Sequence, residues 1–237
     1  MNEAGALPAA APVVACRGLC RSYGEGAAAV HALAGVDFDV SAGEFVSLAG
    51  PSGSGKSTLL NMIGALDVPD AGEVRVEGRS LAGLDRAARA DLRLRRIGFV
   101  FQSYNLVPVL SARENVEFIM QLQGVPAAER RERALAVLAE LGLAELAERR
   151  PGAMSGGQQQ RVAVARAIVT RPALLLADEP SANLDSATTE ELLELLVRLN
   201  GEHGTTIVTA THDPTVMGHA RRRVHMRDGR IERDEAA

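Results

Sequence analysis

Apolar positions along the 237-residue chain form short continuous runs that alternate with longer segments of helical spacing. The continuous runs end at glycine or polar residues and predict buried strands at 43–50, 96–102, 172–180 and 205–213. Segments with helical period predict helices from Lys56 onward and at 111–124, 127–142, 157–169 and 186–200. This alternation predicts an α/β fold with a doubly wound, mostly parallel sheet.

Two further patterns extend this core. Residues 13–18, 36–41 and 73–78 predict an N-terminal antiparallel β layer, and 223–233 predicts a closing hairpin. The block from about 103 to 170 has no strand pattern, so we expect it to form an α-helical subdomain inserted into the sheet. The expected organisation is a disordered tail at 1–12 and one domain at 13–237. Within that domain, 13–102 and about 171–233 would form the core.

Composition narrows the class of protein. A net charge of -4 and an isoelectric point near 5.8 argue against a nucleic-acid partner, and the arginine-rich stretch 85–96 is typical of a solvated amphipathic face. No apolar run reaches the ~20 residues that span a bilayer, and the first residues lack a secretory pattern. Cys16 and Cys20 have no second pair to complete a zinc site and suit a reducing compartment. We therefore expect a cytoplasmic protein.

A glycine-rich loop between the strand at 43–50 and the helix from Lys56 carries the first chemistry. It matches G-x-x-x-x-G-K-[ST] and indicates a P-loop nucleoside triphosphatase that binds ATP and Mg²⁺. Lys56, the one lysine in the chain, should reach the β- and γ-phosphates, and the Ser57 hydroxyl should bind Mg²⁺. The expected ATP-binding residues here are Gly50, Pro51, Ser52, Gly53, Ser54, Gly55, Lys56, Ser57 and Thr58.

Two acidic residues follow the apolar run that ends near 178. Asp178 should lie at the carboxyl edge of the sheet and hold Mg²⁺ through water. Adjacent strand residues point to opposite faces, but Pro180 suggests that the chain turns after Asp178. Such a turn would aim Glu179 at the γ-phosphate as the base for the attacking water.

A second glycine-rich helix start occurs at 154–161, "MSGGQQQR". One interpretation is an ordinary helix start with Ser155 as its N-cap. The other is a second anion site, formed by Ser155 and the backbone N–H groups of Gly156 and Gly157. Because the first loop already covers its own nucleotide, this site would bind the γ-phosphate on another copy of the chain, in a head-to-tail dimer.

These motifs together resemble a known family. Lys56 with its loop, Gln102, Ser155 to Gln158, Asp178 with Glu179, and His212 resemble, in order and spacing, the nucleotide-binding subunit of ATP-binding-cassette (ABC) transporters. The resemblance covers about residues 13–233. The stretches 97–116 and 155–168 further resemble the lipoprotein-release and macrolide-exporter branch, which includes a cell-division ATPase. Met154, Ser181 and Ala182 depart from the usual residues of this branch.

The resemblance implies roles for individual residues. Tyr23 would stack on adenine, Gln102 would contact Mg²⁺ and the attacking water, and His212 would contact the γ-phosphate. Ser155, Gly156, Gly157, Gln158 and Asp185 would bind ATP in trans. Simpler interpretations remain open for three of these residues: a turn tyrosine for Tyr23, a strand end for Gln102, and a helix cap for Asp185.

The expected function is ATP hydrolysis by a homodimer that powers an integral membrane permease, with the chain peripheral on the inner face of the cell membrane. One alternative is a cell-division ATPase that regulates a wall hydrolase through a permease-like partner. A non-transport ABC ATPase is another, although Ser155 follows Gln102 by only 53 positions, which leaves no room for the coiled-coil arm of DNA-repair members. A P-loop kinase would have no use for the Ser155 motif.

Overall fold

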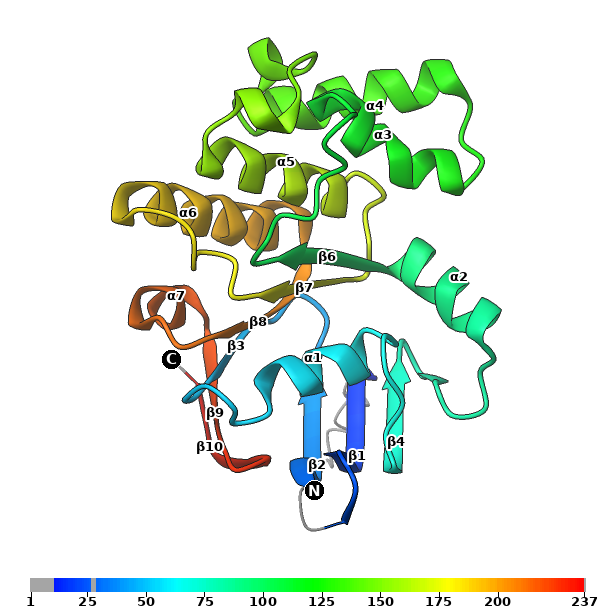
Figure 1. Ribbon diagram of the computed structural model, residues 1–237, viewed down its shortest axis with the longest axis vertical. Helices are drawn as coiled ribbons and strands as arrows, with labels where there is room; N and C mark the ends of the chain where they lie inside the picture. The colour runs from blue at the N-terminus through cyan, green and yellow to red at the C-terminus, as the bar shows by residue number, and fades with distance from the viewer. Residues whose placement is uncertain (1–10, 27–28, 237) are drawn as a thin grey trace, which may run out of the picture.

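The computed structural model describes residues 11–26 and 29–236. The predicted disordered tail at 1–12 therefore lies almost wholly outside the described residues. Within them the chain forms two sheets and a cluster of helices at one end of the molecule (Figure 1). The predicted α/β class is confirmed.

The larger sheet has six strands in the order β10-β9-β3-β8-β7-β6. Its parallel strands are β3 (Phe45–Ala49), β6 (Ile97–Phe101), β7 (Leu174–Asp178), β8 (Thr206–Thr211) and β9 (Arg222–Arg227). Strand β10 (Arg230–Ala236) pairs antiparallel with β9 as the predicted closing hairpin. Leu174 and Leu176 pack on one face of the sheet, and Leu175 and Ala177 pack on the other. Burial on both faces explains why this strand is a continuous apolar run.

The smaller sheet is the predicted antiparallel layer, with strand order β2-β1-β4-β5. Its strands are β1 (Val14–Tyr23), β2 (Val30–Val40), β4 (Ala71–Val76) and β5 (Arg79–Ser80). Strands β1 and β2 extend well beyond the predicted 13–18 and 36–41. Their pairing register shifts after Cys16, where Gly18 has φ +56°, and such a bulge interrupts the alternation that sequence reasoning follows.

Helices lie on both sides of the larger sheet (Figure 1). Helix α1 (Lys56–Ile63) lies between the two sheets, and its Leu59 and Met62 join the core that both sheets share. Helices α5 (Gly156–Ile168), α6 (Ser186–His203) and α7 (Pro214–His219) pack on the opposite side of the larger sheet. Helix α2 (Arg86–Arg96) precedes β6, and Leu92 is its one buried residue.

A helical lobe, residues 103–170, packs on the larger sheet through α5. It contains α3 (Ala112–Leu122), α4 (Ala127–Glu140), the short 3₁₀ turns Ala144–Leu146 and Pro151–Ala153, and α5. Ser111 and Glu114 form a capping box at the start of α3, and Gly142 takes φ +70° just after α4. No helix in the described part of the chain is long and apolar enough to cross a membrane.

Candidate active site

Four parallel strands end at one edge of the larger sheet, and each delivers a predicted site residue there. Strand β3 leads into the phosphate loop at Gly50, β6 into Gln102, β7 into Glu179 and β8 into His212. Phe101 pairs with Asp178, and Asp178 pairs with Ala210, so the three strand ends lie side by side. This register brings residues that are more than a hundred positions apart into one site.

The phosphate loop requires glycine at two close approaches of the backbone. Gly50 has φ +147°, and a Cβ there would lie 2.2 Å from the Met226 carbonyl oxygen. Gly55 has φ +102°, and its Cβ would lie 2.4 Å from the Ala32 carbonyl oxygen. Since the β9–β10 hairpin supplies Met226 and Gly229, and the Gly229 N–H donates to the Ser54 carbonyl over 3.1 Å, the hairpin supports this loop. Sequence reasoning missed that support.

Lys56 is folded over its own loop. Its Nζ donates to the carbonyl oxygens of Gly50, over 2.7 Å, and Pro51, over 2.9 Å. The side chain is buried, and this burial lowers the pKa of Lys56, an effect that the nearby carboxylates of Glu179 and Asp178 oppose. The ammonium group therefore lies inside the loop, next to two acidic residues.

Ser57 and Asp178 meet across the site. The Ser57 hydroxyl donates to Asp178 Oδ1 over 2.9 Å. Burial raises the pKa of Asp178; the Ser57 hydrogen bond works against this shift, and the Glu179 charge adds to it. A hydroxyl and a carboxylate within one hydrogen bond are the hard oxygen donors that suit Mg²⁺.

Glu179 turns out of the strand, as Pro180 suggested. It has φ +45°, which breaks the alternation of β7, and its N–H donates to the Ala210 carbonyl over 2.9 Å. Its Oε1 lies 2.8 Å from His212 Nδ1, and its Oε2 accepts a 3.2 Å hydrogen bond from the Thr211 hydroxyl. The side chains of Glu179 and His212 both line a cavity of about 540 Å³. The carboxylate is thus oriented from both of its oxygens, and Thr211 is a further site residue that the sequence did not indicate.

Comparison with known proteins identifies the family. The model of a family described as ABC transporter matches residues 33–182. The chain belongs to the ABC transporter family.

Individual relatives agree with this membership. The cassette is 48% identical over 226 residues to the macrolide export ATP-binding/permease protein of Marinobacter nauticus, covering 95% of this chain and 35% of that protein. The chain thus spans about a third of the length of the macrolide-export relatives. It is 50% identical to an uncharacterized ABC transporter ATP-binding protein of Thermotoga maritima, covering 89% of both chains. A solved dimeric ATP-binding cassette bound to ADP and phosphate aligns with a TM-score of 0.87 and 43% identity, covering 94% of this chain and 98% of the other.

Gln102 begins an unusual loop in this cassette. Its carbonyl accepts a 2.9 Å hydrogen bond from Asn183 Nδ2, while its side chain is exposed. Tyr104 and Asn105 follow with φ +57° and +50°, a rare conformation for residues other than glycine. The Arg166 guanidinium from α5 donates to the carbonyls of both residues. Burial lowers the pKa of Arg166, and no acidic residue within the described ranges pairs with it. Arg166 thus clamps the loop by its two carbonyls, and the sequence signal for this clamp was an arginine within the otherwise apolar stretch 162–168.

The glycine-rich start of α5 shows the helix-cap interpretation of "MSGGQQQR" directly. The Ser155 hydroxyl accepts from the Gln158 N–H and the Gln158 side chain accepts from the Ser155 N–H, which is a capping box. A Cβ on Gly157 would lie 2.2 Å from Thr188 Cγ2, and one on Gly156 would lie 2.8 Å from the Tyr104 hydroxyl. Both glycines therefore have packing reasons that are independent of any bound anion. No described hydrogen bond joins this stretch to the phosphate loop of the same chain.

The remaining predicted residues have local partners. The Tyr23 hydroxyl donates to Asp67 Oδ2 over 2.9 Å, and the Arg21 guanidinium lies 4.8 Å from the ring centroid, covering one face. The Asp185 carboxylate caps α6 by accepting from the N–H and hydroxyl of Thr188, and these hydrogen bonds lower the pKa of Asp185. The helix-cap interpretation thus applies to Asp185, whereas Tyr23 ends strand β1 rather than lying in a turn, and it is 40% exposed.

Proposed function

We propose that this cassette binds and hydrolyses ATP as a homodimer and uses the closure of the dimer to drive an integral membrane permease. The observation that carries the proposal is the fixed Glu179 carboxylate. It is held by His212 and Thr211 and lies next in sequence to the Asp178 that bonds Ser57. A carboxylate oriented in this way is suited to accept a proton from an attacking water.

The phosphate loop would hold the triphosphate. Lys56 would exchange its two carbonyl partners for phosphate oxygens, which are stronger acceptors because they are charged. The unpaired N–H groups at the start of α1 and the positive end of its helix dipole favour the same anion. Residues 50–58 would therefore bind the phosphates, and the exposed Tyr23 would stack on adenine.

The donor set at the site fits Mg²⁺. Ser57 and Asp178 would hold the ion with the phosphates, and the exposed amide of Gln102 would reach it from the end of β6. Bound there, Mg²⁺ supplies positive charge that neutralises the phosphate oxygens. The chain's part is to orient these oxygen donors and to place Glu179 beside them.

A second copy would complete the site. Ser155, Gly156, Gly157 and Gln158 lie at the start of α5, where Ser155 is exposed and the helix dipole favours an anion. These residues and Asp185 would contact the ATP bound by a partner copy. The dimeric structures of a cassette that is 43% identical to this one support the proposal of a dimer.

An apolar groove offers a surface to the permease. It has a volume of about 330 Å³ and lies where β6 meets the helical lobe, and its apolar lining includes Leu66, Phe99, Phe101, Val107, Phe118 and Ile119. Leu66 and Phe118 are 45% and 38% exposed. A cytoplasmic segment of the permease seated here would contact the core, 13–102 with about 171–233, and the lobe at once. The cassette would then lie on the inner face of the membrane and act with a permease of the macrolide-export or lipoprotein-release type. The support for this is that matched relatives are described as macrolide export ATP-binding/permease proteins.

The catalytic assignment is tested by Glu179→Gln. We expect this variant to bind ATP normally, to hydrolyse it about 10²–10⁴-fold more slowly, and to form a dimer with ATP that is visible by analytical ultracentrifugation. Glu194→Gln, at an exposed position of α6, is the matched control. Near-normal hydrolysis by Glu179→Gln would refute the assignment. Ser155→Arg should bind ATP as a monomer, and ATP-driven dimerisation of that variant would refute the role of α5 in trans.

The partner is tested by capture from gently solubilised membranes of the native host in the presence of ATP. A permease with few transmembrane helices, lost when Phe118 is replaced by Asp, would support the docking groove and the transport function. Capture of only ribosomal or DNA-bound material would overturn the transport function and leave the ATPase chemistry intact.

A further inference from the structure

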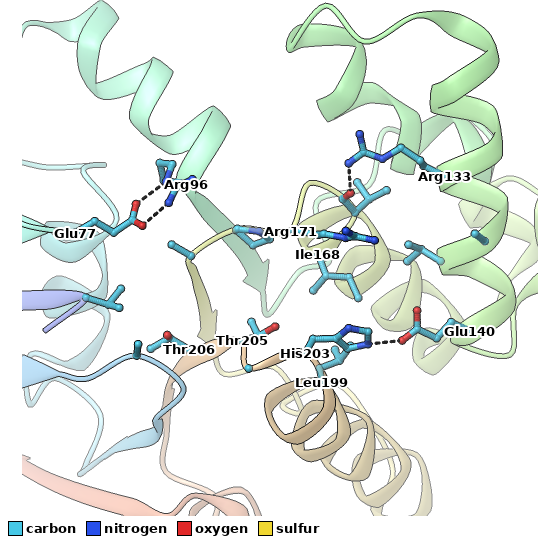
Figure 2. Close-up of a pocket in the computed structure, with 18 residues that line it drawn as sticks. Glu77, Arg96, Arg133, Glu140, Ile168, Arg171, Leu199, His203, Thr205 and Thr206 are labelled. Atoms are coloured by element: carbon cyan, nitrogen blue, oxygen red, sulfur yellow. Dashed lines mark hydrogen bonds and ion pairs between the residues drawn. The ribbon is translucent and has the colours of Figure 1, made fainter. Parts of the chain in front are cut away.

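A cleft of about 770 Å³ opens at the edge of the larger sheet opposite the catalytic edge (Figure 2). Ala173, which precedes β7, and Thr205 and Thr206 at the start of β8 line it. Strand β7 has five residues and carries Asp178 at its other end, so the cleft lies roughly 15 Å from the catalytic carboxylates. Its walls come from α4 and the end of α5 in the lobe and from α6 in the core. The cleft is therefore separate from the nucleotide site.

Positive charge predominates among the six charged or titratable side chains that line the cleft, which are Glu77, Arg96, Arg133, Glu140, Arg171 and His203. Each of the two acids has a basic partner. Glu77 pairs with Arg96 through two hydrogen bonds, and Glu140 Oε1 lies 3.0 Å from His203 Nε2, as the dashed lines of Figure 2 mark. Arg133 and Arg171 remain as the cations that these acids do not neutralise.

These two arginines have capacity for an anion. Arg133 donates to the Val169 carbonyl over 2.8 Å and to Glu129 Oε1 over 3.3 Å; the Glu129 side chain is 52% exposed, and three N–H groups of Arg133 have no partner in the described ranges. The Arg171 guanidinium has no hydrogen bond or ion pair with any residue in the described ranges. Figure 2 shows the Arg171 side chain extended into the cleft between Arg133 and His203. Both guanidinium groups can therefore reach one ligand.

The backbone holds Arg171 in this position. Arg171 has φ +50°, its N–H donates to the Ile168 carbonyl over 2.8 Å, and the ring of the buried Pro172 follows it. An arginine in the left-handed region is uncommon and is energetically less favourable than glycine there. The turn thus presents a long cationic side chain at a position where glycine would suit the backbone better.

We propose that this cleft is a second anion site, which binds a small phosphomonoester through Arg171 and Arg133. Guanidinium groups match phosphate oxygens with paired hydrogen bonds, and the cleft volume lies in the range of small-molecule sites. Apolar side chains of Val137, Ile168 and Leu199 line the same cleft and would pack against the organic part of the ligand. A ligand held there would bridge the lobe and the core on the side away from ATP.

The test is isothermal titration of phenyl phosphate into the full chain, with the phosphate loop first saturated by a non-hydrolysable ATP analogue and Mg²⁺. We expect one saturable site on each chain, with affinity at least tenfold lower in Arg171→Gln and in Arg133→Gln, since each removes a charge-assisted contact. Arg171→Lys should weaken binding less than Arg171→Gln, because it keeps the charge but loses the paired geometry. A parallel titration with inorganic phosphate distinguishes a phosphomonoester from the bare ion. Weaker binding of inorganic phosphate supports the role of the apolar wall, and equal binding overturns it.

The matched control is Arg131→Gln, on the same helix α4, whose side chain is 60% exposed and pairs with Glu148 at 3.8 Å. This variant should bind phenyl phosphate like the unaltered chain. Absence of saturable binding would overturn the proposal. So would unchanged affinity in both Arg171→Gln and Arg133→Gln, or an equal loss in Arg131→Gln. Thermal unfolding of each variant checks that it is folded. ATP hydrolysis is measured in a separate assay, so that failure of the anion site and failure of the proposed ATPase function can be told apart.

Discussion

Gly157→Ala tests how the start of α5 is packed against α6. The new methyl group would lie 2.2 Å from Thr188 Cγ2, whereas carbon atoms in contact are about 3.5–4.0 Å apart. Either the two helices must separate or Thr188 must rotate and give up its hydrogen bond to Asp185, and such overpacking costs about 1–3 kcal/mol. Alanine recovers up to about 1 kcal/mol through its higher helix propensity. We expect the free energy of unfolding to fall by about 1–2 kcal/mol.

Thr188→Ser supplies the compensating change. Serine removes the methyl group that clashes and keeps the hydroxyl that donates to Asp185 Oδ2 over 2.9 Å. In this background Gly157→Ala should be neutral or stabilising, so the two changes should couple by about 1–2 kcal/mol. Gly152→Ala is the control glycine, because a Cβ there would meet nothing within 4 Å.

The assay is urea unfolding followed by far-ultraviolet circular dichroism, for the unaltered chain, the two single variants, the double variant and Gly152→Ala. Stability of Gly157→Ala equal to that of the unaltered chain, with no coupling to Thr188→Ser, would refute the packing argument. The second glycine would then have only the anion-binding explanation that the sequence suggested. The same variants, assayed for ATP-driven dimerisation, show whether this packing also affects the proposed contact in trans.

Three further outcomes are expected. Because burial raises the pKa of Asp178, its charge is less favourable in the fold than in the unfolded chain. Asp178→Asn should therefore raise the free energy of unfolding at pH 7, and the difference between the variant and the unaltered chain should shrink as the pH falls through that raised pKa. A difference that does not change with pH in urea titrations would contradict this. Arg166→Met should lower the free energy of unfolding by about 2–3 kcal/mol, because it leaves the carbonyls of Tyr104 and Asn105 without donors. The control Arg161→Met loses one ion pair with the exposed Glu191 and should lower it by less than about 1 kcal/mol. Equal losses in urea unfolding would contradict the role of Arg166. Burial, with the Asp39 charge, raises the pKa of Cys16 to about 12, so iodoacetamide at pH 8 should modify Cys20 and spare Cys16 until the chain unfolds, as mass spectrometry would show.

Sequence patterns located the parts of the fold that local chemistry specifies. The apolar run at 172–180 predicted β7, and Pro180 after two acids predicted the turn that the φ of Glu179 displays. The roles of Gln102 and His212 came from the family resemblance, whereas the apolar run before Asp178 by itself indicated a carboxylate at the carboxyl edge of the sheet. The inferences about β7, Asp178 and Glu179 thus depended on residues that are neighbours in the chain.

The missed features depend on contacts between distant segments. Arg166 clamps a loop some sixty positions away, and the carbonyls that it satisfies carry no signal in the sequence. Gly157 is needed because Thr188 of another helix lies against it, which no local pattern records. The bulge at Gly18 hid the full length of β1, because the alternation resumes in a shifted register. The sequence thus predicted the elements and the reactive residues better than the contacts that hold them in place.

The buried position of Lys56 makes this residue a reporter of local opening of the phosphate loop. Lys56 is the one lysine in the printed sequence, it is 6% exposed, and it stands where the phosphate loop passes into α1. A protease specific for lysine therefore has a single peptide bond to cut, and it can do so only when the loop and the first turn of α1 open. The rate of that one cleavage measures the local opening of the phosphate loop without a label. Nucleotides and permease segments could thus be ranked by how far each slows a single cut.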